Sequence, residues 1–154
     1  MSRAFVKEPE GGEVFEDLPD RPVSPHRNFV TAEGLALIEA NLARLHSEHA
    51  TAQAGNDRAA LAKTSRELRY WMSRRATAEA ITPKDAATVQ FGSTVTIGRD
   101  DGRRQTFRIV GEDEADPARG TLSYVSPVAR ALLGRSVGEV VRAGNSDAEI
   151  LQIK

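Results

Sequence analysis

Apolar residues recur every three or four positions in a first stretch of the chain, which predicts an amphipathic helix. Thr31 is a favourable N-cap for it, and Glu33 lies in the first turn, where the helix dipole favours an acid. The predicted apolar stripe consists of Leu35, Ile38, Leu42 and Leu45, continued weakly by His49 and Ala52. Gly55 is expected to end the helix, because a residue without Cβ suits a left-handed cap.

A second stretch with helical periodicity follows almost at once. No glycine or proline occurs from Arg58 to about Ala80, and Asn56 or Asp57 can cap this helix. Its predicted buried side carries Leu61, Leu68, Trp71, Met72 and Ala78. Two amphipathic helices joined by a short loop run antiparallel and pack their apolar stripes together. With arms of about 24 residues at about 1.5 Å each, the expected hairpin is roughly 35 Å long.

The pattern changes after Pro83 to the two-residue alternation of β-strands. The first two predicted strands are FGSTVTIGR and QTFRIVG, which flank the turn DDG. A third strand is predicted at TLSYVS, and a closing pair of strands at VGEVVRA and AEILQIK. SPVARALLGR predicts one short helix, in which Ser126 is the N-cap, Pro127 the first helical residue and Gly134 the terminator. The expected fold class is therefore α+β, a helical hairpin followed by a small antiparallel β module with one short helix.

Three segments are expected along the chain. Residues 1–28 combine four prolines and six acids with few large apolar side chains, which predicts a flexible tail. Residues 29–82 contain the predicted hairpin, and residues 83–154 contain the predicted β module. The chain has 154 residues, which suits one small domain with an extended arm.

Composition narrows the function classes. The formal net charge is −1, so any attraction to nucleic acid or to a membrane must be local. The chain has no cysteine, which excludes disulfides and thiolate chemistry. It has no apolar run of the roughly 18 residues that a membrane span needs. These features indicate a cytoplasmic protein with no membrane partner.

Local charge is concentrated on the second predicted helix. Its basic residues are Arg58, Lys63, Arg66, Arg69, Arg74 and Arg75. Such density could bind RNA, DNA phosphates or an acidic protein wall, or it could simply be a solvated helix face. Tyr70 and Trp71 could stack a base, although Trp71 also suits an anchor between the two helices. His46 and His49 have a spacing that could seat a metal, but no third ligand lies near them in the sequence, so no metal site is predicted.

Three stretches follow the predicted hairpin: FGSTVTI, RIVGEDEAD and SPVARALLG. In these stretches the chain resembles the bacterial GreA/GreB transcript-cleavage factors. The combination of DDG, FRIVG and ELRYW is more similar to GreB. The resemblance implies an FKBP-like C-terminal fold that docks on RNA polymerase, with the hairpin entering the secondary channel. It also implies a basic hairpin patch for nascent RNA. The residues expected to face the polymerase are Glu112, Asp113, Glu114, Asp116, Ser126, Pro127 and Arg130. Arg130 could instead pair internally with Glu112 or Asp113.

The tip stretch QAGNDRAA departs from the family pattern. Family members carry two acids there, in a motif close to G-D-x-x-E-N-A, and these help the polymerase hold a second Mg²⁺. Gly55 and Asp57 match part of the motif, but the second acid and its asparagine are absent. Asp57 alone remains, and it equally suits a helix cap. The arms are also shorter than in standard family members by roughly eight to ten residues, or about 12 to 15 Å.

The resulting expectation is a regulator of transcription elongation that is not itself an enzyme and takes no small-molecule substrate. It has no cofactor of its own, and any Mg²⁺ would be shared with the polymerase. Two alternatives stay open. The protein could stimulate transcript cleavage through Asp57, or it could be a nucleic-acid-binding module that uses the basic helix. Its oligomeric state is also open, because exposed hairpin stripes could pair two copies.

Overall fold

The computed structural model describes residues 18–154, so most of the predicted tail lies outside the described residues. The chain divides into two compact units. In the described range, the first unit comprises residues 18–25 and Ile38–Ala76, and the second comprises His26–Leu37 and Thr77–Lys154. Between Leu18 and Lys154, no helix is both long and apolar enough to cross a bilayer.

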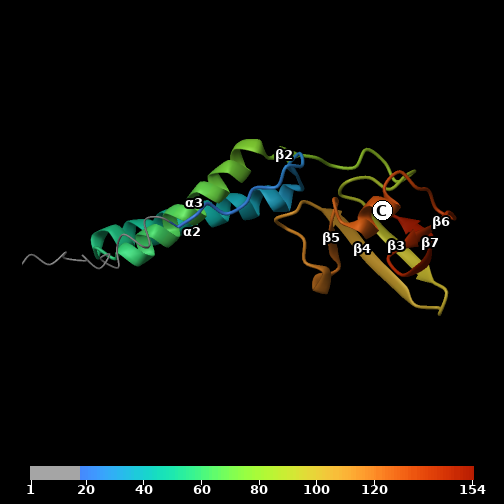
Figure 1. The fold of residues 1–154 in the computed structure, drawn as a ribbon. Coiled ribbons are helices and arrows are strands. Elements are labelled where there is room, and N and C mark those ends of the chain that lie inside the picture. The colour runs from blue at the N-terminus through green and yellow to red at the C-terminus, as the bar shows by residue number, and fades with distance from the viewer. Residues whose placement is uncertain (1–17) are drawn as a thin grey trace, which may run out of the picture. The chain divides into compact units, whose positions relative to one another are not determined.

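The two long helices are α2 (Ala32–Ala54) and α3 (Arg58–Thr77), and they run side by side as a hairpin (Figure 1). Thr31 caps α2 as predicted, since the Gly34 N–H donates to its hydroxyl at 3.0 Å. Ile38 and Leu45 are buried, which confirms the predicted stripe of α2. On α3, Leu68 is buried and Leu61 and Trp71 are half-buried. Burial of these apolar side chains is the pattern expected of two amphipathic helices.

Two predictions for the second helix are wrong. Met72 is 55% exposed, so it does not belong to the buried side. The helix ends at Thr77, three residues earlier than expected, because the next residues form β2 (Glu79–Ala80). This strand pairs in parallel with β1 (Phe29–Val30). Backbone hydrogen bonds from Glu79 to Asn28 and from Ile81 to Val30 satisfy groups that a continued helix would have used.

The second unit contains a five-stranded sheet in the order β5-β4-β3-β7-β6. Its strands are β3 (Thr94–Arg99), β4 (Arg104–Val110), β5 (Thr121–Ser123), β6 (Val140–Ala143) and β7 (Ser146–Ile153). The pairs β3–β4, β3–β7 and β6–β7 are antiparallel, as the alternating pattern predicted. The pair β4–β5 is parallel, which departs from the all-antiparallel expectation. The α+β fold class is confirmed.

The parallel pair follows from the connection between its strands. After β4 the chain passes through an acidic loop, residues 112–116, and a 3-10 turn, η1 (Pro117–Arg119), before it returns beside β4. Asp116 caps this turn by accepting from the Ala118 N–H at 3.2 Å, and Gly120 closes it in the left-handed region at φ 81°. A tight hairpin turn, which would have made β5 antiparallel, is therefore absent at this point.

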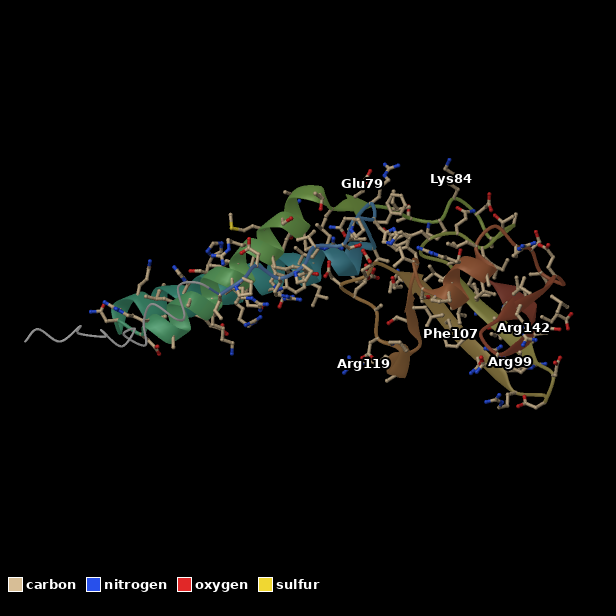
Figure 2. All side chains as sticks on the ribbon, in the orientation of Figure 1. Glu79, Lys84, Arg99, Phe107, Arg119 and Arg142 are labelled. Carbon is tan, nitrogen blue, oxygen red and sulfur yellow. The ribbon has the colours of Figure 1, made fainter. Side chains whose placement is uncertain are left out.

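The core of the second unit lies between the sheet and the short helix α4 (Pro127–Leu132). Val95, Ile97, Ile109, Ile150 and Leu132 are each completely buried. As predicted, Ser126 caps α4 through the Ala129 N–H at 3.3 Å and Pro127 begins it. The Arg99 guanidinium donates to the Ala143 carbonyl at 2.6 Å and thereby connects the end of β3 with the end of β6; Figure 2 labels Arg99.

Candidate functional site

The hairpin tip is a three-residue connection between α2 and α3. The Asp57 carboxylate accepts a hydrogen bond from the Ala60 N–H at 3.1 Å, and the Asp57 carbonyl accepts from the Leu61 N–H at 2.9 Å. Asp57 is therefore the N-cap of α3. Its side chain is exposed, and no second carboxylate belongs to the turn.

The left-handed residue of the tip is Asn56, with φ 51°, whereas Gly55 has no positive φ. The prediction that Gly55 supplies the left-handed cap is therefore wrong by one position. Asparagine tolerates this conformation better than most residues with a Cβ, because its short side chain can hydrogen-bond locally. The sequence pair Gly-Asn predicted the position of the turn correctly. Both residues tolerate the left-handed conformation, so the sequence alone did not show which of them adopts it.

The tip offers a single carboxylate as a possible ligand for a divalent ion. Mg²⁺ requires oxygen ligands in near-octahedral geometry. Asp57 offers one carboxylate, which already serves the helix cap. Among residues 18–154, no three His, Cys, Asp or Glu side chains come together in a way that could hold a metal. The arms measure 23 and 20 residues, slightly less than the predicted 24.

The six predicted basic residues of α3 fall into different environments. Arg74 is only 1% exposed, so it does not contribute to an exposed patch. Arg75 pairs with Glu39 on α2 at 3.2 Å. Arg58 and Lys63 are exposed and make no ion pair with any residue of the described chain. The exposed basic patch is therefore smaller than the sequence suggests.

Arg66 and Arg69 contact a segment that sequence reasoning treated as a loose tail. This segment, residues 18–25, has no helix or strand but lies against α3, and we call it the strap. The Arg66 Nε donates to the Pro19 carbonyl at 2.6 Å, and the Arg69 Nε donates to Asp20 at 2.5 Å. The alternation of acid and base in LPDRP, opposite a basic helix, was the available signal for these contacts.

The guanidinium of Arg21, a residue of the strap, also contacts α3. Arg21 donates to the Glu67 carboxylate at 2.7 Å, and its guanidinium carbon lies 3.8 Å from the centroid of the Tyr70 ring. Tyr70 in turn meets Trp71 edge-on, with ring centroids 5.1 Å apart. The proposed base-stacking aromatics are therefore in contact with an arginine of the chain itself.

His49 has a structural contact inside the hairpin. Its Nδ1 lies 2.8 Å from the hydroxyl of the buried Thr64, which links α2 to α3. His46 is exposed. Nearby, a hollow of about 490 Å³ lies between the two helices. It is lined by Arg44, Leu45, Glu48, Ala60, Lys63, Thr64 and Glu67.

In the second unit, the acidic loop is partly committed to internal contacts. Glu114 accepts hydrogen bonds from the Thr31 N–H at 2.9 Å, from the Thr31 hydroxyl and from the Gly111 N–H at 3.1 Å. Asp116 caps the η1 turn. Glu112 and Asp113 are half-buried and also engaged. Of this predicted partner surface, the acids therefore contribute much of their hydrogen-bonding capacity to the fold itself.

The other predicted contact residues lie on or next to α4: Ser126 and Pro127 at its start and Arg130 in its last turn. Ser126 uses its hydroxyl as the helix cap, Pro127 is exposed, and Arg130 is exposed. Arg130 makes no ion pair with a residue between Leu18 and Lys154, so the alternative of an internal pair with Glu112 or Asp113 is not realised. Its guanidinium is available for a partner.

Electrostatic shifts occur at exposed pairs of the second unit. The Arg27 guanidinium donates to Glu79 at 2.6 Å and lowers the pKa of that carboxyl below its ordinary value; Figure 2 labels Glu79. The pKa of Glu33 is also lowered, first by a backbone hydrogen bond at the start of α2 and then by Arg108 at 3.3 Å. These shifts stabilise local structure and do not indicate acid–base chemistry.

The described residues thus form a basic helical hairpin with one acid at its tip and a five-stranded sheet with a short helix, which is an α+β architecture. Residues 84–154 match the family model described as "Transcription elongation factor, GreA/GreB, C-term". This part of the chain is therefore similar to the C-terminal domain of the GreA/GreB factors, in agreement with the sequence resemblance. The matched segment contains every strand of the five-stranded sheet and α4.

Curated relatives carry the same names. Transcription elongation factor GreB of Neisseria meningitidis is 40% identical over 96 residues, covering 58% of this chain and 59% of that protein. Transcription elongation factor GreA of Thermomicrobium roseum is 43% identical over 88 residues, covering 57% of this chain and 56% of that protein. The chain thus spans little more than half the length of these two relatives.

Solved structures show a more distant likeness. GreA factor homolog 1 (Gfh1) of Thermus thermophilus is 18% identical, with a TM-score of 0.42 over 84% of this chain and 99% of that one. GreA/GreB of Nitrosomonas europaea is 17% identical, with a TM-score of 0.41 over 82% of this chain and 98% of that one. At this distance the two structures carry no argument about function.

Proposed function

We propose that this protein is a transcription elongation factor of the cytoplasm that binds RNA polymerase through its C-terminal domain and inserts its hairpin into the secondary channel. The observation that carries this proposal is the match of residues 84–154 to the GreA/GreB C-terminal family. Arg130, in the last turn of α4, is exposed and forms no ion pair with residues 18–154, which supports a partner surface on this domain. Interfaces are enriched in arginine, which forms bidentate pairs with carboxylates.

The hairpin acts by occupying the channel and not by promoting transcript cleavage. A cleavage factor must add carboxylates to the metal centre of the polymerase, whose second Mg²⁺ needs oxygen ligands. Here Asp57 is the single acid of the tip, and its carboxylate caps α3. The protein itself has no catalytic role in this proposal and needs no cofactor or small-molecule substrate.

A binding experiment tests the proposal. We expect the tagged full chain to retain bacterial core RNA polymerase in a pull-down, with a GreB protein as the positive control. Arg130→Glu should weaken retention, because it reverses an exposed charge on the proposed contact surface. Arg142→Glu makes the same charge change at an exposed position of β6 and should leave retention unchanged. Absence of retention under conditions where GreB binds would refute the proposal.

Two alternatives make different predictions. A cleavage cofactor that uses Asp57 would shorten the transcripts of arrested polymerase complexes, and Asp57→Ala would abolish the effect. A nucleic-acid-binding module is favoured by the six basic residues and one acid of α3. It would bind free RNA without polymerase, with an affinity that falls steeply as salt rises. Within the main proposal the same basic residues contact the nascent transcript.

A further inference from the structure

The strap covers two arginines on one side of α3. Lys63, Arg66 and Arg69 follow one another at spacings of three residues on α3. Residues three apart are neighbours on a helix surface, so each of these side chains lies next to the following one. The Pro19 carbonyl accepts from Arg66 at 2.6 Å, and the Asp20 carboxylate accepts from Arg69 at 2.5 Å. A carbonyl and a carboxylate oxygen of the chain itself thus occupy the positions that an anionic ligand would take.

Arg21 of the strap contacts an acid and an aromatic ring of α3. Arg21 pairs with Glu67, the one acid of α3, and its guanidinium lies over the Tyr70 ring at 3.8 Å. A planar guanidinium on an aromatic face takes the place in which a base would stack. The strap therefore covers two arginines and one face of an aromatic ring.

These groups together match the chemistry of single-stranded nucleic acid. Arginines bind backbone phosphates, and aromatic rings stack bases without sequence preference. We propose that residues 18–25 are an internal strap that masks a single-stranded RNA-binding face of α3, formed by Arg66, Arg69 and Tyr70. The face binds RNA once the strap detaches. This inference rests on the proposed contact between α3 and the transcript, and it does not depend on polymerase binding.

The strap is held weakly enough to detach. The side chains of Arg69 and Asp20 are 50% and 70% exposed, and exposed pairs of this kind contribute little to stability. The pair of Arg21 and Glu67 is more sheltered, with side chains 32% and 25% exposed. Arg21 is therefore the main anchor, and its removal should shift the equilibrium toward the detached state.

The test is Arg21→Ala in the full chain, with fluorescence anisotropy of a labelled single-stranded oligouridylate as the readout. Loss of a positive charge alone would weaken RNA binding. Loss of the strap has the opposite effect, and we expect binding about three- to tenfold tighter, the range that one or two exposed ion pairs represent.

Arg103→Ala is the charge-matched control. Arg103 lies in the turn between β3 and β4, is exposed and pairs with Asp101, so its loss should leave RNA binding unchanged or slightly weaker. Asp20→Asn removes the other charged strap contact and should also tighten binding. Circular dichroism should show the same helix content in all three variants.

The strap has an optical reporter in the same protein. Trp71 is the single tryptophan of the chain, and the Arg21 guanidinium carbon lies 5.9 Å from its ring centroid. We expect Arg21→Ala to increase acrylamide quenching of its fluorescence. Equal or weaker RNA binding by Arg21→Ala, unchanged quenching, or no RNA binding by any form at low salt would each overturn the masking proposal. None of these results would contradict polymerase binding, which the pull-down tests separately.

Discussion

The Glu114 carboxylate accepts hydrogen bonds from both the backbone N–H and the hydroxyl of Thr31, a residue 83 positions earlier in the chain. It also accepts from the Gly111 N–H. Thr31 is the N-cap of α2, so the first turn of this helix is fastened to the acidic loop within the second unit. One acid of the predicted polymerase surface therefore has a structural function.

Removal of this carboxylate should destabilise the second unit. We expect Glu114→Ala to lower the free energy of unfolding by about 1–3 kcal/mol, because hydrogen bonds to a charged group are lost and their donors, on the buried residues Thr31 and Gly111, are left without this acceptor. The measurement is urea denaturation followed by circular dichroism, in which the midpoint falls at constant slope. Glu149→Ala, at an exposed position of β7, is the control and should change stability by less than about 0.5 kcal/mol.

Gly34 faces the same carboxylate closely. A Cβ added at Gly34 would lie 2.0 Å from the Glu114 Oε2, and all of its nearest contacts are atoms of this one side chain. Gly34→Ala should therefore displace Glu114 from Thr31 and cost about 1–3 kcal/mol.

A double-mutant cycle separates this clash from an intrinsic effect of alanine. In a Glu114→Ala background the space is open, so Gly34→Ala should be neutral or stabilising by up to about 1 kcal/mol, since alanine favours helix. An equal cost of Gly34→Ala in both backgrounds would contradict the contact.

Local patterns predicted the main elements of both units. The apolar stripe of α2, the alternation of Val95 and Ile97 in β3, and the Ser126–Pro127 start of α4 all depend on residues close in sequence. The Thr31 cap is local in the same sense. Periodicity and capping are properties of short windows, which a single sequence contains in full.

Contacts between distant segments were not predictable in this way. The two-residue pairing of β1 with β2 shortened α3, yet two residues carry no periodicity. The burial of Arg74 contradicts the usual exposure of arginine. The strap contacts and the Glu114–Thr31 pair join residues 46 to 83 positions apart, and only the folded backbone brings them together. For the candidate site, the residue types were therefore predictable from the sequence. Which of these side chains are exposed and which are engaged in contacts within the chain was not.

The Arg27–Glu79 pair predicts a pH dependence. The folded-state pKa of Glu79 lies below its ordinary value because Arg27 hydrogen-bonds its charged form. The stability from this pair is therefore present above the unfolded-state pKa and is lost as the pH falls through the folded-state pKa. Carbon-13 NMR titration of the Glu79 carboxyl should show the lowered value, and Arg27→Gln should raise it. Arg119→Gln, far along the chain at the η1 turn, should leave the Glu79 titration unchanged.

Substitutions of Asp57 separate the capping function from a catalytic one. Asp57→Ala should lower the free energy of unfolding by about 1 kcal/mol, because the Ala60 N–H loses its acceptor. Asp57→Ser keeps a capping oxygen and should retain most of this stability, but it removes the carboxylate. Thermal denaturation monitored at the helical circular dichroism signal measures both effects.

The functional readout of the same pair of variants tests the tip. If Asp57 is only a cap, Asp57→Ser should match the unsubstituted protein in polymerase retention, and neither protein should shorten transcripts in backtracked complexes. A metal ligand behaves differently, because a serine hydroxyl cannot replace a carboxylate on Mg²⁺. Transcript shortening by the unsubstituted protein that disappears in Asp57→Ser, at unchanged stability, would assign the single acid to the polymerase metal site and contradict the capping-only interpretation.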